Sequence, residues 1–374
     1  MRILHTSDWH LGLSLHHRSF IEEQRDCIRQ MVQLVQEEKI DIVIVSGDIF
    51  DSRVASSEAI ALYSGAVTQI CQECGAEMVV IAGNHDGAAR LSSCSALLAR
   101  SGLYVTGKLP QKLLSCHKEN VEIFAIPYFH IDEVRRRYPQ QHIDSYEMAM
   151  ACLCDEIRSN WSPKCRHILA AHAYVTGTQL SESDHAALLG GAQQVGAQVF
   201  EGFDYVALGH LHRAQQPREQ VCYSGSPFPY SFGEAEQDKS VSVYDTDSGE
   251  IRRIVLHESK RLHVISGTLQ KVLEQAVQEP LEDYIKVEIT DQPAGVEVLE
   301  MLRRDYPNLL CVTGKSVIAE GEQITLTAEE METLSPQHVL GKFCQETAGY
   351  EPSVQQTEWF CKALAEAENG GDLQ

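Results

Sequence analysis

The first part of the chain alternates short apolar runs with longer segments whose apolar residues recur at helical spacing. The run Ile42–Val45 is apolar at every position, as expected for a strand that is buried on both faces. Strands are predicted at 3–7, 41–46 and 77–82, and helices at 20–38, 57–72 and 90–100. This order of strands and helices predicts an α/β protein in which helices cover a sheet.

The second part of the chain begins with further strands and then changes pattern near residue 260. Strands are predicted at 121–126, 167–171, 205–208, 221–224, 240–245 and 251–257. The stretch 176–195 has few strand or helix signals, and loops of this length are often functional. Beyond residue 260, strands at 262–265, 284–289 and 309–318 alternate with helices at 269–278 and 296–305.

The last fifty residues predict two helices, one beginning at Ser335-Pro336 and the other near Ser353. We therefore expect a large domain at 1–258, a small α/β domain at 259–325 and a helical segment at 326–374.

Five short polar motifs stand where predicted strands end. They are DWH at 8–10, GDIFD at 47–51, GNHD at 83–86, His172, and GHLH at 209–212. Because the carboxyl ends of strands gather at one edge of an open sheet, these side chains are expected to converge. Carboxylate, imidazole and amide groups suit manganese, zinc or iron. The motif set thus predicts two divalent metals, ~3.5–4 Å apart, that hydrolyse phosphate esters.

Spacing within the motifs suggests how the ligands are presented. Asp8 and His10 are two residues apart, so an extended chain would point both to one side, and His210 and His212 repeat this spacing. One such pair alone is usually a surface or core pair, and it is the set of five that indicates a metal site.

Two further motifs suggest distinct roles for neighbouring residues. Asp48 follows the most apolar strand and is the candidate that bridges both metals. Asn84 offers a neutral oxygen that limits negative charge beside a phosphate. His85 is adjacent to this ligand, so we expect it to point elsewhere and to be free to protonate a leaving oxygen.

Composition narrows the class of protein. The net charge of −22 argues against a protein that coats nucleic acid through a basic surface, although metals and a few local cations can still contact phosphates. No apolar run is long enough to span a membrane, and the first residues lead directly into a strand without an export signal. The twelve cysteines then suit reduced thiols, so we expect a cytoplasmic protein.

With these motifs in place, the chain resembles the calcineurin-like metallophosphoesterases and, more narrowly, the SbcD family, the bacterial nuclease subunit that works with the SbcC ATPase. The stretches that carry the resemblance are HTSDWHLG with the following Glu22-Glu23-Gln24, SGDIFD, AGNHD, GHLH, YSGSP at 223–227, and YSFGE at 230–234. The resemblance is dense to about residue 235 and looser beyond. It implies a four-layer sandwich with a small α/β capping domain and a C-terminal helical pair.

The resemblance also implies a role for each site residue. One metal would be held by Asp8, His10, Asp48 and His212, and the other by Asp48, Asn84, His172 and His210. His85 matches the catalytic histidine, with Asp86 orienting its ring, and the two metals would be Mn²⁺. The family further implies a homodimer through helices of the nuclease domain, for which 57–72 and 90–100 are our candidates, within a heterotetramer that includes an SbcC-type ATPase docked on the helical tail.

We therefore expect a manganese-dependent DNA nuclease that cuts single strands and, gated by its ATPase partner, processes duplex ends in DNA repair and recombination. The alternatives are a phosphodiesterase for a small nucleotide and a non-catalytic binding scaffold. The second domain and the helical tail argue against the former, and the complete ligand set argues against the latter. His17 and Arg18 are the candidate DNA contacts, whereas the triplet Arg135–Arg137 is more typical of a solvated face.

Overall fold

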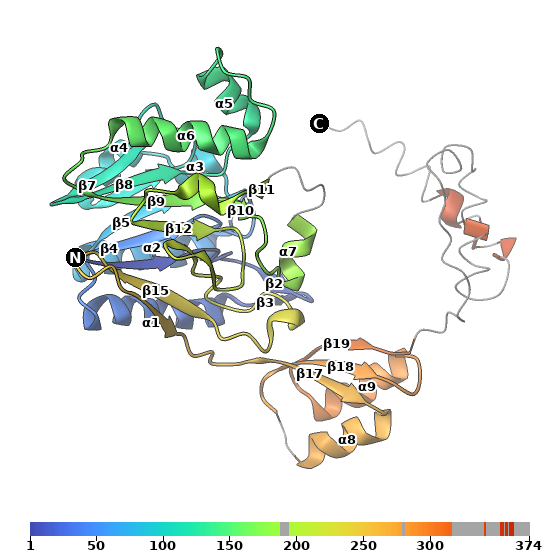
Figure 1. Cartoon of the computed structure of the whole chain (residues 1–374). Helices are drawn as coiled ribbons and strands as arrows, with labels where there is room; N and C mark the ends of the chain where they lie inside the picture. The colour runs from blue at the N-terminus through green and yellow to red at the C-terminus, as the bar shows by residue number, and fades with distance from the viewer. Residues whose placement is uncertain are drawn as a thin grey trace. The chain divides into compact units, whose positions relative to one another are not determined.

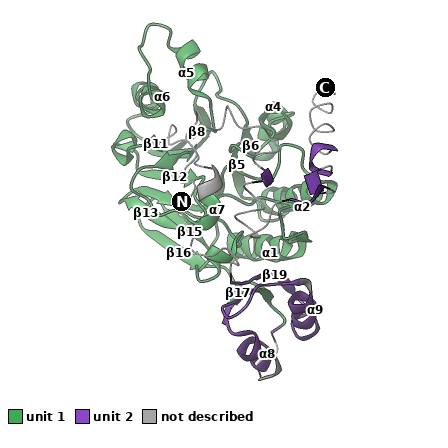
Figure 2. Cartoon of the chain, turned by 90° about the vertical axis from the view of Figure 1, so that its right-hand side faces the viewer, with its two compact units in different colours: residues 1–264, 282–286 green, residues 265–281, 287–374 purple. Residues whose placement is uncertain are grey.

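A computed structural model of the chain describes residues 1–187, 194–278 and 281–315, together with 340–341, 352–354, 356–357 and 359–362. The chain divides into two compact units, 1–264 with 282–286, and 265–281 with 287–374 (Figure 2). The predicted start of a helix at Ser335-Pro336 and most of the predicted helical tail lie outside the described residues. Among the described helices, none has the length and apolarity that crossing a membrane requires.

The first unit contains a six-stranded sheet in the order β16-β15-β1-β4-β5-β6. Its strands are β1 (Arg2–Thr6), β4 (Ile42–Ser46), β5 (Glu77–Ile81), β6 (Leu103–Thr106), β15 (Ser240–Asp245) and β16 (Ile251–Val255). Strands β1, β4, β5 and β6 are parallel, whereas β15 and β16 pair antiparallel on the other side of β1. The carboxyl ends of β1, β4 and β5 therefore lie at one edge.

A second six-stranded sheet of the same unit has the order β13-β14-β12-β9-β8-β7. Its strands are β7 (Leu114–Lys118), β8 (Val121–Ile126), β9 (Arg166–His172), β12 (Tyr205–Gly209), β13 (Gln215–Arg218) and β14 (Val221–Tyr223). Strands β8, β9, β12 and β14 are parallel, and the antiparallel β7 and β13 form the edges.

Alternate side chains of the central strands fill different cores, and this places the two sheets face to face. On β4, Ile42 and Ile44 belong to the core between the sheets, whereas Val43 and Val45 pack outward against helices. Helices α1 (Ile21–Glu37) and α2 (Ser57–Thr68) cover the first sheet, and α5 (Ile131–Arg137) and α6 (Tyr146–Asn160) cover the second. Figure 1 shows α1 and α6 on opposite outer faces. The expected four-layer sandwich is confirmed.

Beyond residue 261 the chain forms a three-stranded sheet in the order β17-β18-β19 with two helices. The elements are β17 (Leu262–Gly267), α8 (Leu269–Gln278), β18 (Tyr284–Ile289), α9 (Val296–Asp305) and β19 (Leu309–Thr313). The Tyr306 hydroxyl donates to the Val272 carbonyl at 2.9 Å, which ties the end of α9 to α8. The α/β pattern predicted for this part of the chain is confirmed over the described residues.

Two local predictions were wrong. The helix predicted at 90–100 is interrupted, because Cys94 has a φ of 60° and separates α3 (Ala88–Leu91) from α4 (Ser95–Leu98). The stretch 176–195 is not featureless, since it contains helix α7 (Glu182–Ala187). Left-handed backbone at a cysteine is rare, so helical periodicity alone does not reveal such a break.

Candidate metal centre

Backbone hydrogen bonds join the loops that carry the first candidate ligands. The amide of Asp8 donates to the carbonyl of Gly47 at 3.0 Å, and the amide of His10 donates to the carbonyl of Asp48 at 3.0 Å. Because β1 and β4 are neighbouring parallel strands, their loops continue the pairing beyond the sheet. Candidate ligands that are distant in sequence are thereby held side by side.

The backbone at these ligands differs from the extended chain predicted from their spacing. Four of the candidate ligands have left-handed φ values, namely Asp8 (52°), His10 (40°), Asp48 (49°) and His210 (104°). The extended backbone expected for Asp8 and His10 was therefore wrong, although both side chains do point into one cluster. Each of these four residues instead has left-handed backbone. Such backbone is energetically unfavourable outside glycine and is concentrated at functional sites, where the surrounding structure enforces it.

The first cluster of converging ligand atoms consists of Asp8, His10 and His212, whose atoms all lie within 4.8 Å of one another. The Nε2 atoms of His10 and His212 face each other at 3.2 Å. His10 Nε2 also lies 3.8 Å from Asp48 Oδ2.

The second cluster consists of Asp48, His172 and His210, with Asn84 between the two rings. The Asn84 Oδ1 atom lies 3.0 Å from His172 Nε2 and 3.1 Å from His210 Nδ1. His172 Nε2 is also 3.4 Å from Asp48 Oδ2. Asp48 therefore lies next to ligands of both clusters, as a bridging carboxylate requires.

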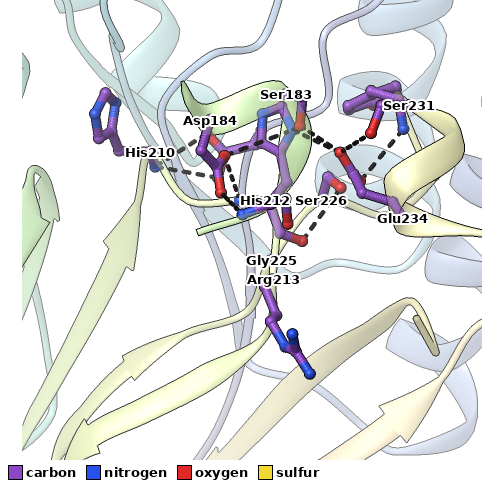
Figure 3. A network of polar contacts seen from close by, with 12 residues as sticks. Ser183, Asp184, His210, His212, Arg213, Gly225, Ser226, Ser231 and Glu234 are labelled. Atoms are coloured by element: carbon purple, nitrogen blue, oxygen red, sulfur yellow. Dashed lines mark hydrogen bonds and ion pairs between the residues drawn. The ribbon is translucent and has the colours of Figure 1, made fainter. Parts of the chain in front are cut away.

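Hydrogen bonds on the far side of two rings assign the nitrogen that faces the clusters. His172 Nδ1 lies 2.9 Å from the Ser46 carbonyl, and only a protonated nitrogen can donate to that oxygen. His212 Nδ1 lies 2.7 Å from Ser183 Oγ and 3.5 Å from Glu234 Oε1 (Figure 3). In the neutral rings the His172 Nε2 lone pair then faces the Asn84 and Asp48 oxygens, and the His212 Nε2 lone pair faces His10 Nε2. Lone pairs that converge in this way fit cations, and the mixed nitrogen and oxygen set suits two divalent metals.

A buried ion pair supports the Glu234 side of this network. Lys239 Nζ lies 2.6 Å from Glu234 Oε2, 2.9 Å from Ser226 Oγ and 3.2 Å from the His212 carbonyl. Burial raises the pKa of Glu234, but the Lys239 charge and the hydrogen bond with His212 outweigh burial and hold that pKa well below its usual range. A permanently ionised Glu234 is suited to orient the His212 ring, the arrangement that carboxylates make with metal-bound histidines.

Ser183, Asp184 and Glu234 were missed as functional residues in the sequence. Asp184 accepts from the His212 amide at 3.2 Å, so it holds the same loop as Glu234 (Figure 3). Two signals pointed to this network. Glu234 belongs to the YSFGE stretch, and the other two residues fall in the long stretch 176–195.

The protonation states of the histidines differ because their surroundings differ. Burial lowers the pKa of His172, yet the Asp48 carboxylate outweighs burial and raises that pKa to about 9. Burial and the neighbouring His172 lower the pKa of His210 to about 3, so its ring stays neutral. A metal that binds the second cluster therefore displaces the proton of His172, and its affinity falls as the pH falls.

His85 is beside the clusters but differs from the ligands in its contacts. Its amide donates to Asp48 Oδ1 at 2.8 Å, and its Nδ1 lies 3.0 Å from the Asp51 carbonyl, which fixes the ring. The His85 and His10 rings are 4.8 Å apart, and both line a pocket of about 150 Å³ over the clusters. Nε2 is then the nitrogen available for proton transfer.

Contrary to expectation, Asp86 does not orient the His85 ring but has a different structural role. Its carboxylate accepts from the amides of Ile49, Phe50 and Gly83, at 3.1, 3.0 and 2.9 Å. It therefore ties together the loops that follow β4 and β5, while the Asp51 carbonyl holds the ring that Asp86 was predicted to orient.

Two glycines in the motifs are required by close approach. A Cβ atom on Gly47, whose φ is 95°, would lie 2.3 Å from His172 Nδ1. A Cβ atom on Gly83 would lie 2.2 Å from Asp48 Oδ1. Any side chain at these positions would push a ligand out of place, which explains why the motifs begin with glycine.

His17 and Arg18, the predicted DNA contacts, lie in or beside a small hairpin of β2 (Ser14–Leu15) and β3 (Arg18–Ser19). Both side chains are exposed, and the Arg18 guanidinium stands 5.8 Å from the centre of the Tyr284 ring. Neither residue is part of the metal pocket's lining as the structure describes it.

Comparisons with known proteins agree with this geometry. Residues 1–214 match the calcineurin-like phosphoesterase family, and residues 258–348 match SbcD_C, described as the type 5 capsule protein repressor C-terminal domain. The chain belongs to the calcineurin-like phosphoesterases, which are metal-dependent enzymes. The narrower resemblance to the SbcD family is also confirmed. The D subunit of nuclease SbcCD from Staphylococcus epidermidis is 28% identical over 318 residues, which cover 84% of this chain and 85% of that protein.

Solved structures show more distant likenesses. A protein of Thermus thermophilus aligns with a TM-score of 0.42 and 12% identity, over 68% of this chain and 99% of its own. A dimetal phosphatase from Danio rerio aligns with a TM-score of 0.39 and 13% identity, over 65% of this chain and 92% of its own. Neither likeness is close enough to support an argument about activity.

Proposed function

We propose that this chain is the nuclease subunit of an SbcCD-type complex, a manganese-dependent phosphodiesterase acting on DNA. It would cut single strands internally and would process duplex ends when an SbcC-type ATPase partner permits. The observation that carries the proposal is the convergence of two ligand clusters beside Asp48, with His85 at the same pocket. The relative named as part of the SbcCD nuclease supports the choice of DNA as substrate.

The chemistry divides between the ions and the side chains. Two bound Mn²⁺ ions, held by the first and second clusters with Asp48 between them, would activate water and stabilise charge on the phosphoryl oxygens. Asn84 contributes an oxygen without adding negative charge near the substrate. His85 Nε2 would give a proton to the leaving oxygen while Nδ1 stays bonded to the Asp51 carbonyl.

The C-terminal part would serve the partner rather than the chemistry. We assign residues 1–258 to the nuclease, 259–325 to a capping domain and 326–374 to a helical segment that docks on the ATPase. The match at 258–348 supports this division. Among the described residues of the tail, Trp359 is 64% exposed and Val354 is 78% exposed. Exposed apolar side chains that join into one patch mark a surface that a partner covers.

The quaternary structure would be a homodimer of this chain within a heterotetramer. Apolar side chains on two elements of the first unit support this proposal, because Ile60 of α2 is 51% exposed and Leu97 of α4 is 63% exposed. Where such side chains join into one contiguous apolar patch, they mark a surface that another chain covers. We place the complex in the cytoplasm, and we retain His17 and Arg18 as candidate contacts to DNA phosphates.

The decisive test is cleavage of circular single-stranded DNA by the purified chain, with bis(p-nitrophenyl) phosphate as a small substrate. We expect manganese-dependent cleavage of the circle, which offers no end and therefore reports internal cutting. Hydrolysis of the small ester alone would favour the small-nucleotide phosphodiesterase. Inactivity on both substrates in the presence of Mn²⁺ would favour the scaffold.

The partner proposal is tested by deleting residues 327–374. The truncated chain should still cut single strands, but it should no longer co-purify with an SbcC-type ATPase or show ATP-stimulated action on duplex ends. A truncated chain that is soluble and active and still binds the ATPase normally would contradict the docking role.

A further inference from the structure

A groove of about 800 Å³ adjoins the metal pocket. Asn84 lines both, so the two share a wall at a candidate metal ligand. The rest of the groove is formed by the loops that follow β4, β5, β6 and β8 and by helices α3 and α5. The pocket over the metals, at about 150 Å³, is much smaller. A substrate confined to the reacting phosphate would leave the groove unused.

The groove is lined by more positive than negative groups, in a protein whose net charge is −22. Its four cationic side chains are Arg53, Arg90, Lys108 and Arg136. Three acidic residues also line it, and each is engaged. Asp132 pairs with Arg135 at 2.9 Å, the Glu133 carboxylate accepts from the His130 amide at 3.2 Å, and Asp86 accepts from backbone amides. The surface offered to a ligand therefore favours anions.

The three arginines at 135–137 on α5 differ in whether they are available to bind an anionic ligand. Arg135 donates to the Ile143 carbonyl at 2.8 Å, and Arg137 donates to Glu156 at 2.8 Å, so both are structural. Arg136 lines the groove and has no polar partner within the described part of the chain. The interpretation of the whole triplet as a solvated face was therefore too broad, since its three members have two different roles.

An aromatic side chain lines the groove close to the second cluster. Tyr128, which follows β8, is half-buried and lines the groove. Its ring centre lies 6.4 Å from that of His172 and 5.6 Å from that of His130. An aromatic ring beside a row of cations is the combination that binds an unpaired base and its backbone, because every base can stack on a ring whatever its sequence.

We propose that this groove binds single-stranded DNA on one side of the phosphate that is cut. Lys108 and Arg136 contact backbone phosphates, and Tyr128 stacks on a base next to the metal centre. The proposal rests on the proposed nuclease function and deepens it, because it states why the enzyme would prefer a polynucleotide to a small phosphodiester. Each added nucleotide that reaches the groove contributes binding, so kcat/KM rises with the length of the strand.

The test compares the intact protein with the double variant Lys108→Gln/Arg136→Gln. The matched control is Lys112→Gln/Arg253→Gln, which removes two exposed cations that do not line the groove. Binding of a 20-nucleotide strand is measured in EDTA at several salt concentrations. Cleavage in Mn²⁺ is measured on strands of two to twenty nucleotides and on bis(p-nitrophenyl) phosphate.

We expect the groove variant to bind the 20-mer roughly 10- to 30-fold more weakly at about 0.1 M salt, with a log–log salt slope smaller by about 1.4, since each phosphate contact on a single strand contributes about 0.7. Its kcat/KM should fall more for the 20-mer than for the small ester, and the gain with strand length should shrink. The control should match the parent protein. Tyr128→Ala should weaken 20-mer binding, whereas Tyr128→Phe, which keeps the ring, should restore it.

Three results would overturn the groove proposal. They are a salt slope equal to that of the control, an undiminished gain with strand length, and equal losses on DNA and on the small ester. Failure of the nuclease proposal itself looks different, because the parent protein would then hydrolyse the small ester and leave strands of every length intact.

Discussion

The two ligand clusters are built from similar side chains but are oriented by different parts of the fold. In the second cluster, His172 is fixed by the carbonyl of Ser46, which ends a central strand. In the first cluster, His212 is fixed by Ser183 of α7 and by Glu234 of a separate turn. One histidine thus depends on the backbone of a buried sheet, and the other on side chains from helix α7 and from a separate turn.

This difference indicates that the two metal positions tolerate mutation unequally. A backbone carbonyl cannot be removed by substitution, so the orientation of His172 is protected. The orientation of His212 depends on a hydroxyl and on a carboxylate that are both replaceable. His10, the other ring of the first cluster, has a buried Nδ1 with no hydrogen-bond partner among the described residues. We therefore expect mutations of the residues that orient the rings to act mainly on the first cluster.

The largest effect is expected from a substitution that acts on both clusters at once. Asp48→Ala should lose both metals, because this carboxylate lies next to ligands of each cluster. His10→Ala is the matched comparison and should weaken mainly the first cluster. Metal content after dialysis against Mn²⁺ measures both. Two full equivalents retained by the Asp48 variant would show that this residue is not the bridge.

The next largest effect is expected from a substitution at His85, which tests catalysis separately from metal binding. His85→Gln should keep both metals and the fold but should slow cleavage by roughly 10²- to 10⁴-fold, because the proton donor for the leaving oxygen is lost. Steady-state kinetics with metal analysis on the same preparation give the answer. A variant that turns over almost as fast as the parent would remove His85 from the mechanism.

Glu234→Gln tests the unequal support of the clusters directly. It should weaken metal affinity at the first cluster by about 10- to 100-fold and leave the second cluster nearly unchanged, since the hydrogen-bond partners of metal-bound histidines act at that scale. It should also lower the free energy of unfolding by about 3–5 kcal/mol, because Lys239 is left buried without its counter-charge. Manganese titration and denaturant unfolding measure the two effects. Equal weakening of both clusters would refute the comparison.

Ser183→Ala should have the smallest effect of this series. It removes the hydrogen bond to His212 and the one that Ser183 donates to Glu234, but Glu234 keeps its ion pair with Lys239 and no charge is stranded. The loss of such a bond costs about 1 kcal/mol, so first-cluster affinity should fall several-fold. Ser159→Ala, an exposed change on α6, is the control. If manganese titration shows both variants to be indistinguishable from the parent, Ser183 does not orient the ring.

Much of this architecture follows from local pattern. The apolar run of β4 predicted a strand buried on both faces, and its alternate residues indeed fill the cores on either side. The ligand motifs were recognisable because each stands just beyond an apolar strand, and parallel strands bring their ends together whatever the details of the loops. The glycines at 47 and 83 were part of the same signal, although the reason for them became visible only where they approach His172 and Asp48.

Other features were decided by tertiary structure. The left-handed backbone of Asp8 and His10 depends on hydrogen bonds to the neighbouring loop, so their spacing alone suggested the wrong geometry. The pairing of His212 with Ser183 and Glu234 joins segments that no sequence period relates. The separate roles of Arg136 and its neighbours likewise depend on which partners the second sheet and its helices bring within reach. Sequence periodicity determines which face of an element is buried, whereas the partners of a polar side chain are set by long-range packing that a local pattern does not encode.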